Sequence, residues 1–353
     1  MAQINKTRKV AALLENGHAT VLHQPVPEVG EGELLVRVHA SLLSPGTELS
    51  QARQSRREKV GSEKVVRTFG YQNAGVVEAI GPGVERFKAG DRVACMGPGA
   101  LHTDNAVVPQ NLAVPLPENV SFEEGAYCHL AATALMAVRR GKVSLGENLL
   151  VVGAGLIGHL SAQLGELSGS RVMLWDTLPA RLEIAQKSGR VRTVCIGAAE
   201  PIVAAEQFTR GRGFDVAIVA IGGEGSGVLR QVHDVMQVTP DGHREGRVVM
   251  VGGLVTTTQW AAGLGNLDVL SSARTGPGYH DEQWERGKRE YPYPWVRWST
   301  RDNLELVIQL IAEGKLQVKP LTTHRLKLEE VDRAVSAHIE EPNGVLGTIL
   351  LME

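Results

Sequence analysis

A glycine run near the middle of the chain, GAGLIG at Gly153–Gly158, constrains the fold more than any other feature. The apolar stretch Leu149–Val152 before it predicts a buried strand, and Leu156–Leu167 after it predicts a helix. A glycine-rich turn alone has a purely structural interpretation. Between a strand and a helix it predicts the phosphate-binding turn of a dinucleotide-binding fold.

Each position of this run has a separate role in such a turn. Gly153 permits the tight turn, Gly155 lets the backbone approach a pyrophosphate, and Gly158 lets the helix pack closely on the strand. Leu156 and Ile157 open the helix, whose first amides and dipole favour an anion. We therefore expect all five residues to bind the cofactor.

An acidic residue selects between the two common dinucleotides. Asp176 ends the next predicted strand, 18 residues beyond Gly158. A carboxylate there accepts hydrogen bonds from the ribose hydroxyls and repels a 2′-phosphate, so NAD is favoured over NADP. Arg181, five residues later, is interpreted as a helix arginine stacking near the adenine.

Strand and helix alternate after about residue 126, which predicts an α/β unit with a parallel sheet covered on both faces. The first 125 residues instead suggest short strands without helices between them, hence a small all-β barrel or sandwich. One helix is expected over Pro179–Lys187, with Gly189 as its C-terminal stop. The expected strands are Lys9–Leu14, Leu34–Ala40, Gly75–Ile80, Asp91–Met96, Leu149–Val152, Arg171–Asp176, Thr193–Ile196, Asp215–Ile221, Arg247–Val251 and Gly347–Leu351.

Composition excludes several classes of function. A net charge of −2 and the lack of a long basic run argue against a nucleic-acid partner. The N-terminus has no apolar signal core, and no stretch approaches the length of a membrane span. Three isolated cysteines indicate neither a disulfide framework nor a four-thiolate zinc lobe. We expect a cytoplasmic protein with no membrane partner.

Four short segments resemble motifs of the medium-chain dehydrogenase/reductase superfamily, and the resemblance covers nearly the whole chain. Gly70–Val77 resembles its G-H-E-x-x-G-x-V segment, Ser44–Glu48 its I-C-G-T-D segment, Gly90–Val93 its G-D-R-V, and Thr322–Arg325 its late T-H-R. The resemblance implies a GroES-like β-rich catalytic domain at 1–128 and 298–353. It implies a Rossmann dinucleotide-binding domain, a doubly wound parallel sheet, at 129–297.

The zinc ligands of that superfamily are not retained. Its cysteine falls on Pro45, its histidine on Tyr71 and its glutamate on Gln72. His129 lies near the third ligand position when Thr133 is aligned with the threonine that contacts the cofactor. One imidazole without partners cannot hold zinc, which needs three protein ligands in a catalytic site. We therefore expect no metal.

Without zinc, side chains must move the proton of the alcohol. By resemblance, Thr47 is the hydroxyl that passes the substrate proton toward the cofactor, and Ser50 stands where a relay histidine often follows. Tyr71 is the second candidate, because a phenol can act as acid or base if nearby positive charge lowers its pKa. His129 is the third, as a base suited to neutral pH. The structural alternatives are a turn cap for Thr47, space filling for Tyr71 and a helix-start role for His129. Gln72 is a candidate substrate contact.

Two further glycine turns follow the fourth and fifth strands of the Rossmann pattern. They are Ile221-Gly222 and Gly252-Gly253. Ligands of open parallel sheets bind outside the carboxyl ends of the strands. By resemblance, both turns flank the nicotinamide.

An aromatic insertion is expected at about 272–298, where Tyr279–Trp298 holds three of the five tryptophans and three of the five tyrosines. Aromatic faces together with charged groups suit a sugar or ring substrate, so the segment is interpreted as a substrate lid. A subunit interface fits the same composition. Arg274, His280 and Trp284 are the candidate substrate contacts.

These features predict a zinc-independent, NAD-dependent dehydrogenase that oxidises a secondary hydroxyl of a sugar, cyclitol or glycoside. The chain resembles a zinc-less branch that includes sugar and polyol dehydrogenases and bacteriochlorophyllide dehydrogenases. One alternative is a quinone or enoyl reductase, which Asp176 disfavours because those enzymes usually prefer NADPH. Another is a non-catalytic dinucleotide sensor. The small-molecule substrate is the expected partner, and a homodimer is the expectation from the resemblance.

Overall fold

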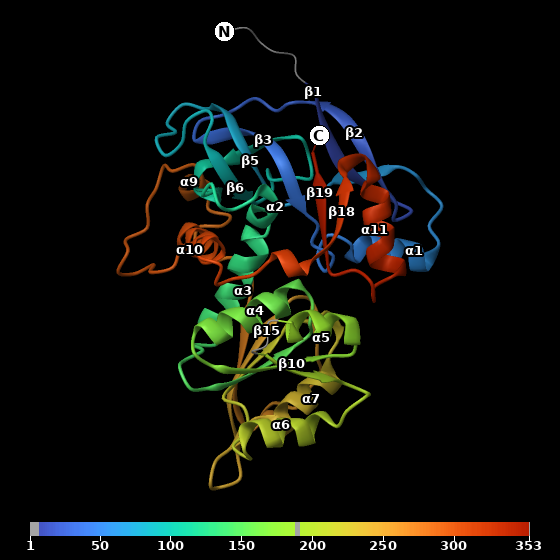
Figure 1. Cartoon of the computed structure of the whole chain (residues 1–353), viewed down its shortest axis with the longest axis vertical. Coiled ribbons are helices and arrows are strands. Elements are labelled where there is room, and N and C mark those ends of the chain that lie inside the picture. Colours follow the sequence, from blue (N-terminus) through green and yellow to red (C-terminus); the bar gives the residue numbers. More distant parts are fainter. Residues whose placement is uncertain (1–6, 188–190, 353) are drawn as a thin grey trace. The chain divides into compact units, whose positions relative to one another are not determined.

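The computed structural model describes residues 7–187 and 191–352, which form two compact units (Figure 1). The first unit contains the chain up to Ala132 and from Thr275 onward, and the second runs from Thr133 to Arg274. Gly189, the expected helix stop, lies outside the described residues.

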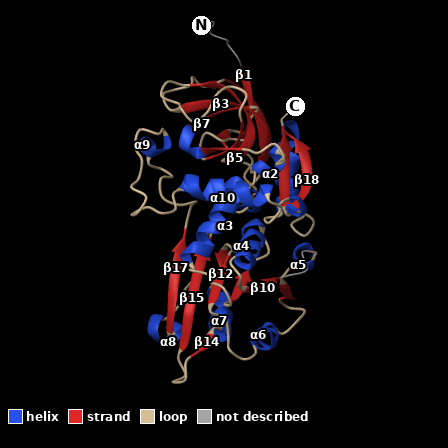
Figure 2. Ribbon diagram, turned by 60° about the vertical axis from the view of Figure 1, so that its left-hand side comes forward, coloured by secondary structure: helices blue, strands red, loops and turns tan. Residues whose placement is uncertain are grey.

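The second unit is built on a parallel sheet in the order β11-β10-β9-β12-β15-β17, with a short antiparallel strand β14 beside β15 (Figure 2). The order reverses between β9 and β12, which places the switch point next to the strand that precedes the glycine run. The strands are β9 (Asn148–Val152), β10 (Arg171–Asp176), β11 (Arg192–Cys195), β12 (Val216–Val219), β13 (Gly223–Glu224), β14 (Gln237–Val238), β15 (Arg244–Val251), β16 (Leu254–Val255) and β17 (Asn266–Ser272).

Helices cover both faces of this sheet, α4 and α5 on one side and α6 and α7 on the other (Figure 1). The α6–α7 side encloses a core in which Trp175, Phe214 and Val232 are fully buried. The helices of this unit are α4 (Leu156–Leu167), α5 (Pro179–Gln186), α6 (Pro201–Thr209), α7 (Ser226–Val235) and α8 (Trp260–Leu264). The predicted doubly wound Rossmann sheet is confirmed.

The first unit is β-rich. One sheet has the order β18-β19-β3-β5-β6-β8, with β7 also paired to β3, and a three-stranded sheet has the order β2-β1-β4. The strands are β1 (Thr7–Leu14), β2 (Ala19–Pro25), β3 (Glu33–Leu42), β4 (Val65–Thr68), β5 (Gln72–Ile80), β6 (Arg92–Met96), β7 (Asn105–Pro109), β8 (Ala113–Pro115), β18 (Thr322–Lys327) and β19 (Gly347–Leu351). Its helices are α1 (Ser50–Glu58), α2 (Phe122–Gly125), α9 (Glu282–Glu285), α10 (Thr300–Ala312) and α11 (Val331–Glu340), while α3 (Cys128–Arg140) is shared with the second unit.

Both domain boundaries in the structure differ from the predicted ones. The sequence placed them at 128/129 and 297/298, whereas the compact units meet at 132/133 and 274/275. The residues from Thr275 to Arg297, expected in the Rossmann domain, belong to the β-rich unit. The reason is packing, because Trp284 is only 1% exposed and its carbonyl accepts a hydrogen bond from the buried Asn111 of that unit.

Helix α1 and strand β17 are two of the elements that were not predicted. Helix α1 is rich in arginine and glutamine and buries only Ala52, so its apolar periodicity is weak. Strand β17 alternates between buried and exposed positions at the sheet edge and lacks the apolar run of its neighbours.

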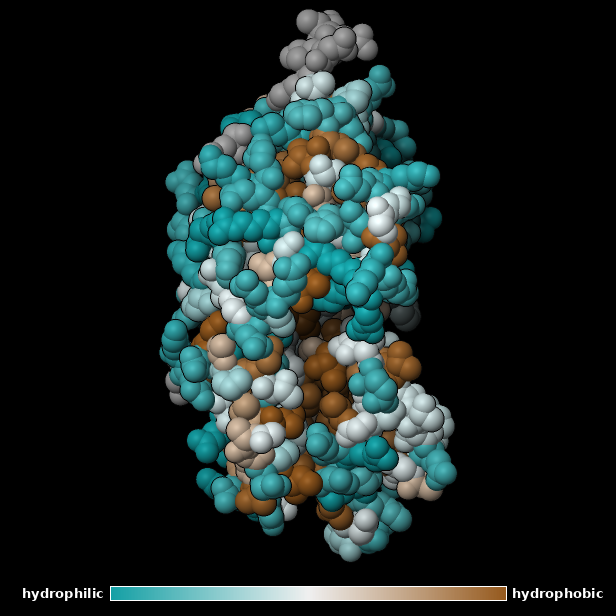
Figure 3. Space-filling model, turned by 90° about the vertical axis from the view of Figure 1, so that its right-hand side faces the viewer, coloured by the Kyte–Doolittle hydropathy of each residue, from teal (hydrophilic) through white to brown (hydrophobic). Residues whose placement is uncertain are grey.

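Hydrophilic side chains make up most of the face drawn in Figure 3, and the hydrophobic ones gather mainly in its lower half. Over residues 7–187 and 191–352, no helix is both long enough and apolar enough to cross a membrane.

Candidate active site

The glycine run of the Rossmann unit has the geometry of a phosphate-binding turn. Gly153 has a φ of 99°, and a Cβ there would lie 2.6 Å from the Ile221 side chain. A Cβ on Gly158 would lie 1.7 Å from the Gly153 carbonyl oxygen, so helix and turn meet backbone to backbone. Gly155 is the N-cap of α4, and a Cβ on it would meet only open space.

These features fit a dinucleotide. No side chain of the described residues caps α4, so its first-turn amides are open to an anion. The open space at Gly155 is where a pyrophosphate would approach the backbone. Leu156 is buried and Ile157 half-buried at the start of the same helix.

Asp176 lies beside this turn. Its Oδ2 accepts a hydrogen bond from the Ala154 amide at 2.6 Å, and its Oδ1 accepts one from the Leu178 amide at 2.8 Å. Arg181 stands on α5 close enough to His159 for its backbone to hydrogen-bond the imidazole. Burial lowers the pKa of His159 to about 4, so this ring is neutral at pH 7. His159 was not singled out from the sequence, since a histidine on a helix carries no signal by itself.

The two later glycine turns lie together at the carboxyl ends of β12 and β15. The Gly223 amide donates to the Gly253 carbonyl at 3.0 Å, and β13 pairs with β16 just beyond Gly222 and Gly252. Ile221 also contacts the first glycine turn, as its side chain faces Gly153. Thr133 is half-buried on α3, one turn after His129.

In the β-rich unit, Tyr71 and Thr47 come together. Tyr71 directly precedes β5, and Thr47 lies in the segment between β3 and α1. The side chains of Thr47 and Ser44 lie within hydrogen-bonding reach of the Tyr71 phenol. Three hydroxyl groups therefore form one polar cluster, in which Ser44 is a member that the sequence did not reveal.

An aromatic group adjoins this cluster. The His129 ring lies 4.5 Å from the Tyr71 ring, centroid to centroid, and its Nδ1 is 3.3 Å from the Tyr71 carbonyl oxygen. Tyr279 stands edge-on to His129 at 5.8 Å and stacks on His280 at 3.9 Å. The rings of Tyr71, His129, Tyr279 and His280 therefore contact one another in that order. That residue was not among the candidates, because nothing in the sequence links it to residues 150 positions earlier.

The protonation states differ from those expected. Burial, followed by the Glu48 carboxylate, raises the pKa of Tyr71 above its ordinary value, against the opposing hydrogen bonds of Ser44 and Thr47. None of the groups that shift this pKa is positively charged, so Tyr71 keeps its proton at neutral pH. Burial lowers the pKa of His129 to about 4, so its ring is neutral there and a weaker base than expected.

Two candidate substrate contacts are corrected. Gln72 is fully buried, its amide donates to the Leu42 carbonyl at 3.3 Å, and its oxygen accepts from the Leu130 amide at 3.2 Å. It joins β3 to the start of α3. Trp284 is buried against Gly278 and Tyr291 and serves as core of the insertion.

The other three candidates, Ser50, Arg274 and His280, are exposed. Ser50 is exposed and donates to the Thr47 carbonyl at 3.2 Å. Arg274 is exposed with a φ of 66° and ends the Rossmann unit.

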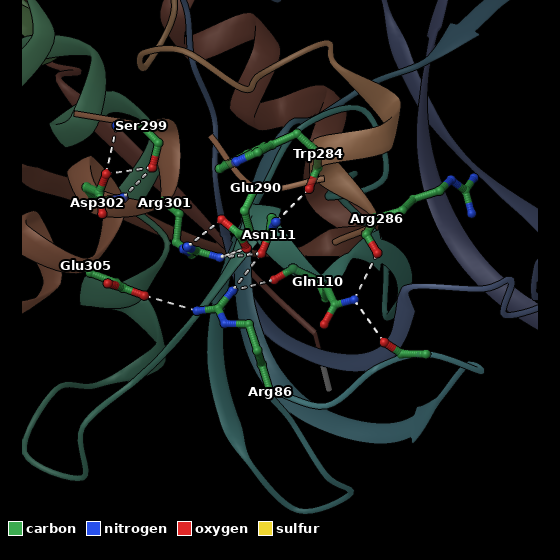
Figure 4. Close-up of polar contacts among 11 residues, drawn as sticks. Arg86, Gln110, Asn111, Trp284, Arg286, Glu290, Ser299, Arg301, Asp302 and Glu305 are labelled. Atoms are coloured by element: carbon green, nitrogen blue, oxygen red, sulfur yellow. Dashed lines mark hydrogen bonds and ion pairs between the residues drawn. The ribbon is translucent and has the colours of Figure 1, made fainter. Parts of the chain in front are cut away.

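The aromatic insertion is anchored by polar contacts at its base (Figure 4). Asn111 donates to the Trp284 carbonyl at 2.6 Å, and Gln110 donates to the Arg286 carbonyl at 2.9 Å. Arg301 pairs with Glu290 at 3.0 Å and also bonds Asn111. Beyond this base, Tyr293 and Trp295 are 64% and 86% exposed. The lid and interface interpretations both remain predictions.

The described residues contain no group of three or more His, Cys, Asp or Glu side chains arranged to hold a metal ion. The position next to Tyr71 that could bind a substrate oxygen is instead lined by hydroxyls and an imidazole.

Comparisons with known proteins agree with this architecture. Residues 30–132 match the family model "Alcohol dehydrogenase GroES-like domain". Sorbitol dehydrogenase of Mus musculus is 27% identical over 93% of this chain and 91% of its own length. L-Idonate 5-dehydrogenase of Vitis vinifera is 26% identical over 90% and 87%. The crystal structure of 2R,3R-butanediol dehydrogenase from Bacillus subtilis superposes with a TM-score of 0.74 at 20% identity, over 98% of this chain and 99% of that one.

The fold, the glycine turn and these similarities define an oxidoreductase with a nicotinamide cofactor. Nearly the whole chain is similar to alcohol and sugar dehydrogenases, and its fold is that of the medium-chain dehydrogenase/reductase superfamily.

Proposed function

We propose that this protein is a zinc-independent, NAD-dependent dehydrogenase that oxidises a secondary hydroxyl of a sugar, cyclitol or glycoside. The observation that carries the proposal is that Tyr71, which by resemblance stands at the position of a metal-binding histidine, lies within hydrogen-bonding reach of the Thr47 and Ser44 side chains. Its relatives that act on sorbitol and idonate support a polyol or sugar substrate.

The side chains have distinct roles in this proposal. NAD, held by the Gly153–Gly158 turn and Asp176, accepts a hydride when bound. Tyr71 keeps its proton at neutral pH and donates a hydrogen bond to the substrate oxygen. Thr47 is exposed, so it can accept the substrate's hydroxyl proton while it passes its own proton to water, which is the final acceptor, since a hydroxyl both donates and accepts. The neutral His129 supplies a hydrogen-bonding ring beside them.

The absence of zinc is argued from the residues at the aligned positions. Pro45 has no ligand atom in its side chain, and the amide of Gln72 is engaged by backbone groups on both sides. The Tyr71 phenol stays protonated, and zinc binds the deprotonated forms of its ligands.

Purified protein incubated with NAD and a panel of polyols, sugars, cyclitols and glycosides tests the function through NADH absorbance. We expect turnover of at least one secondary alcohol, at the same rate after treatment with EDTA. Reduction of quinones or enones by NADPH, with no oxidation of any alcohol, would instead identify a reductase. One zinc per chain by metal analysis would contradict the metal-free mechanism.

The preference for NAD is attributed to Asp176. Asp176→Asn removes the charge that repels a 2′-phosphate and one acceptor of the ribose and backbone groups. Hydrogen bonds to charged groups contribute about 1.5–3 kcal/mol. We therefore expect kcat/KM for NAD to fall about 10- to 100-fold while that for NADP holds or rises.

Asp215→Asn is the matched control, because Asp215 also accepts a backbone amide, from Asn148 at 2.8 Å, at the opposite end of the strands. Its NAD to NADP ratio should equal that of the wild type. An unchanged ratio in Asp176→Asn would refute the assignment.

A further inference from the structure

A buried acid–imidazole pair lies next to the hydroxyl cluster. Glu48 follows Thr47 in the chain, and the side chains of Glu48 and His102 are 1% and 0% exposed. His102 Nε2 is 3.1 Å from Glu48 Oε2, which also accepts the Ser44 amide at 2.8 Å. Glu48 Oε1 is buried and has no hydrogen-bond partner among the described residues.

The hydrogen bonds along this series of contacts bear on how many protons the Glu48–His102 pair carries. The single hydroxyl proton of Ser41 goes to the Gln72 carbonyl at 2.9 Å, so its oxygen accepts from His102 Nδ1. A neutral imidazole has only that one N–H, and its Nε2 lone pair would then face a carboxylate lone pair. With Ser41 donating to the Gln72 carbonyl, the contact between Nε2 and Oε2 involves one more proton shared by the two groups, whereas the other neutral tautomer would leave that carbonyl without the Ser41 hydroxyl.

The two ends of this series of contacts lie on the two segments that form the hydroxyl cluster. One end is the Gln72 carbonyl, one residue after Tyr71, and the other is the Ser44 amide. The Ser44 side chain in turn lies within hydrogen-bonding reach of the Tyr71 phenol. The pairing of β3 with β5 brings the two segments together, and Ser41, His102 and Glu48 add a second link between them beside the site.

Few other charged or titratable groups face the pair. From β4, Arg67 donates to the Glu48 backbone carbonyl at 3.2 Å and not to the carboxylate. From α1, Arg53 donates to the Pro45 carbonyl at 2.7 Å. The ring of Phe69 lies edge-on to His102 at 5.0 Å, and the remaining titratable neighbour is Tyr71 itself.

We propose that Glu48 and His102 are positioning residues, whose shared proton holds Ser44 and Thr47 against Tyr71 for the proton transfer. The proposal rests on the proposed dehydrogenase function. Neither residue touches the substrate. The sharing of a proton by two fully buried groups keeps the pair neutral, which lets it lie in the interior beside the site.

The test compares two variants of Glu48. Glu48 Oε2 takes both contacts, so in Glu48→Gln the amide oxygen at that position accepts from the Ser44 amide and from Nε2–H of a neutral His102. Nδ1 of that tautomer accepts from the Ser41 hydroxyl, which gives up the Gln72 carbonyl, so the links from Ser44 to His102 and Ser41 survive. Glu48→Ala breaks them. We expect Glu48→Ala to lower kcat at least about tenfold with the KM for NAD unchanged, and Glu48→Gln to recover most of that loss. Equal rates for Glu48→Ala and the wild type would overturn the proposal.

If Glu48→Ala does not fold, His102→Asn serves in its place, because its amide can still donate to Ser41 while the link to Glu48 is lost. His338→Gln is the matched control. His338 is a buried histidine of the same unit, with Nε2 3.0 Å from the Thr348 hydroxyl, and its loss should leave kcat at the wild-type value. A loss of kcat equal to that of His102→Asn would show a general effect of buried histidines and overturn the assignment.

Proton NMR separates this proposal from the proposed function. Buried imidazole protons resonate far downfield, and the wild type should show two such signals that vanish in His102→Asn, one of which is also lost in Glu48→Gln. If no alcohol is oxidised but both signals are present, the dehydrogenase function fails and the shared proton stands. If only one signal is present in a protein that oxidises alcohols, the shared proton is refuted.

Discussion

Gly158→Ala is expected to abolish NAD binding and to destabilise the Rossmann unit. The added Cβ would lie 1.7 Å from the Gly153 carbonyl oxygen and 2.9 Å from its carbon. Both are backbone atoms, so no rotamer change relieves the clash, and α4 must move away from the turn. Overpacking that side chains can relax costs about 1–3 kcal/mol, and this case should exceed it. A displaced α4 also removes the amides that receive the pyrophosphate, so we expect the Kd for NAD to rise more than about 100-fold.

Fluorescence titration with NADH and thermal unfolding measure the two effects. Gly227→Ala is the control, since Gly227 lies in α7 and a Cβ there meets nothing within 4 Å. Alanine at that helical site should stabilise by up to about 1 kcal/mol. If Gly158→Ala binds NADH as the wild type does, the helix does not receive the cofactor as we infer.

The Rossmann unit could be predicted nearly to the residue because its signals are local. Strand β10 and helix α4 have the predicted bounds, Arg171–Asp176 and Leu156–Leu167. Buried parallel strands give continuous apolar runs, and glycine marks the turns between them. The edge strand β17 lacks that run and was missed.

The proton-handling site could be predicted only in part, because it is assembled from contacts over long sequence distances. Thr47 and Tyr71 were found through the motifs that surround them. Tyr279 and His102 lie in no motif, and their roles depend on rings and hydrogen bonds that join distant segments. Trp284 shows the opposite failure. The aromatic composition of its segment suited a ligand-binding surface, but tertiary packing buries the Trp284 side chain.

The pH response of the wild type follows from the same site. The pKa of Tyr71 is raised, so its phenol is protonated throughout the neutral range and should give no alkaline limb in kcat there. The pKa of His129 is lowered to about 4, so its neutral form persists above that value and is lost as the pH falls through it. We expect kcat to be flat between about pH 6 and 9, measured with NAD and the substrate both saturating. A bell-shaped pH dependence of kcat centred near pH 7 would show that a group outside this site controls the reaction.

Tyr71→Phe and Thr47→Val should together give the largest catalytic loss. Each removes one hydroxyl while keeping the shape of the side chain, so the fold and the KM for NAD should be retained. General acid–base groups contribute about 10²- to 10⁴-fold, and we expect each single variant to lower kcat by at least about 100-fold on that basis. Because the Thr47 side chain lies within hydrogen-bonding reach of the Tyr71 phenol, the double variant should lose less than the product of the two single losses.

Ser50→Ala separates this mechanism from a general sensitivity of the segment between β3 and α1. Ser50 lies three residues after Thr47 and donates to its carbonyl, but it is exposed and is not among the groups that shift the pKa of Tyr71. Its removal should change kcat less than about threefold. If Tyr71→Phe and Thr47→Val also stay within that range, the proton does not travel through these hydroxyls. A group supplied from elsewhere, such as His129 or bound solvent, must then receive it, and the replacement of the metal ligands by Pro45, Tyr71 and Gln72 would need another explanation.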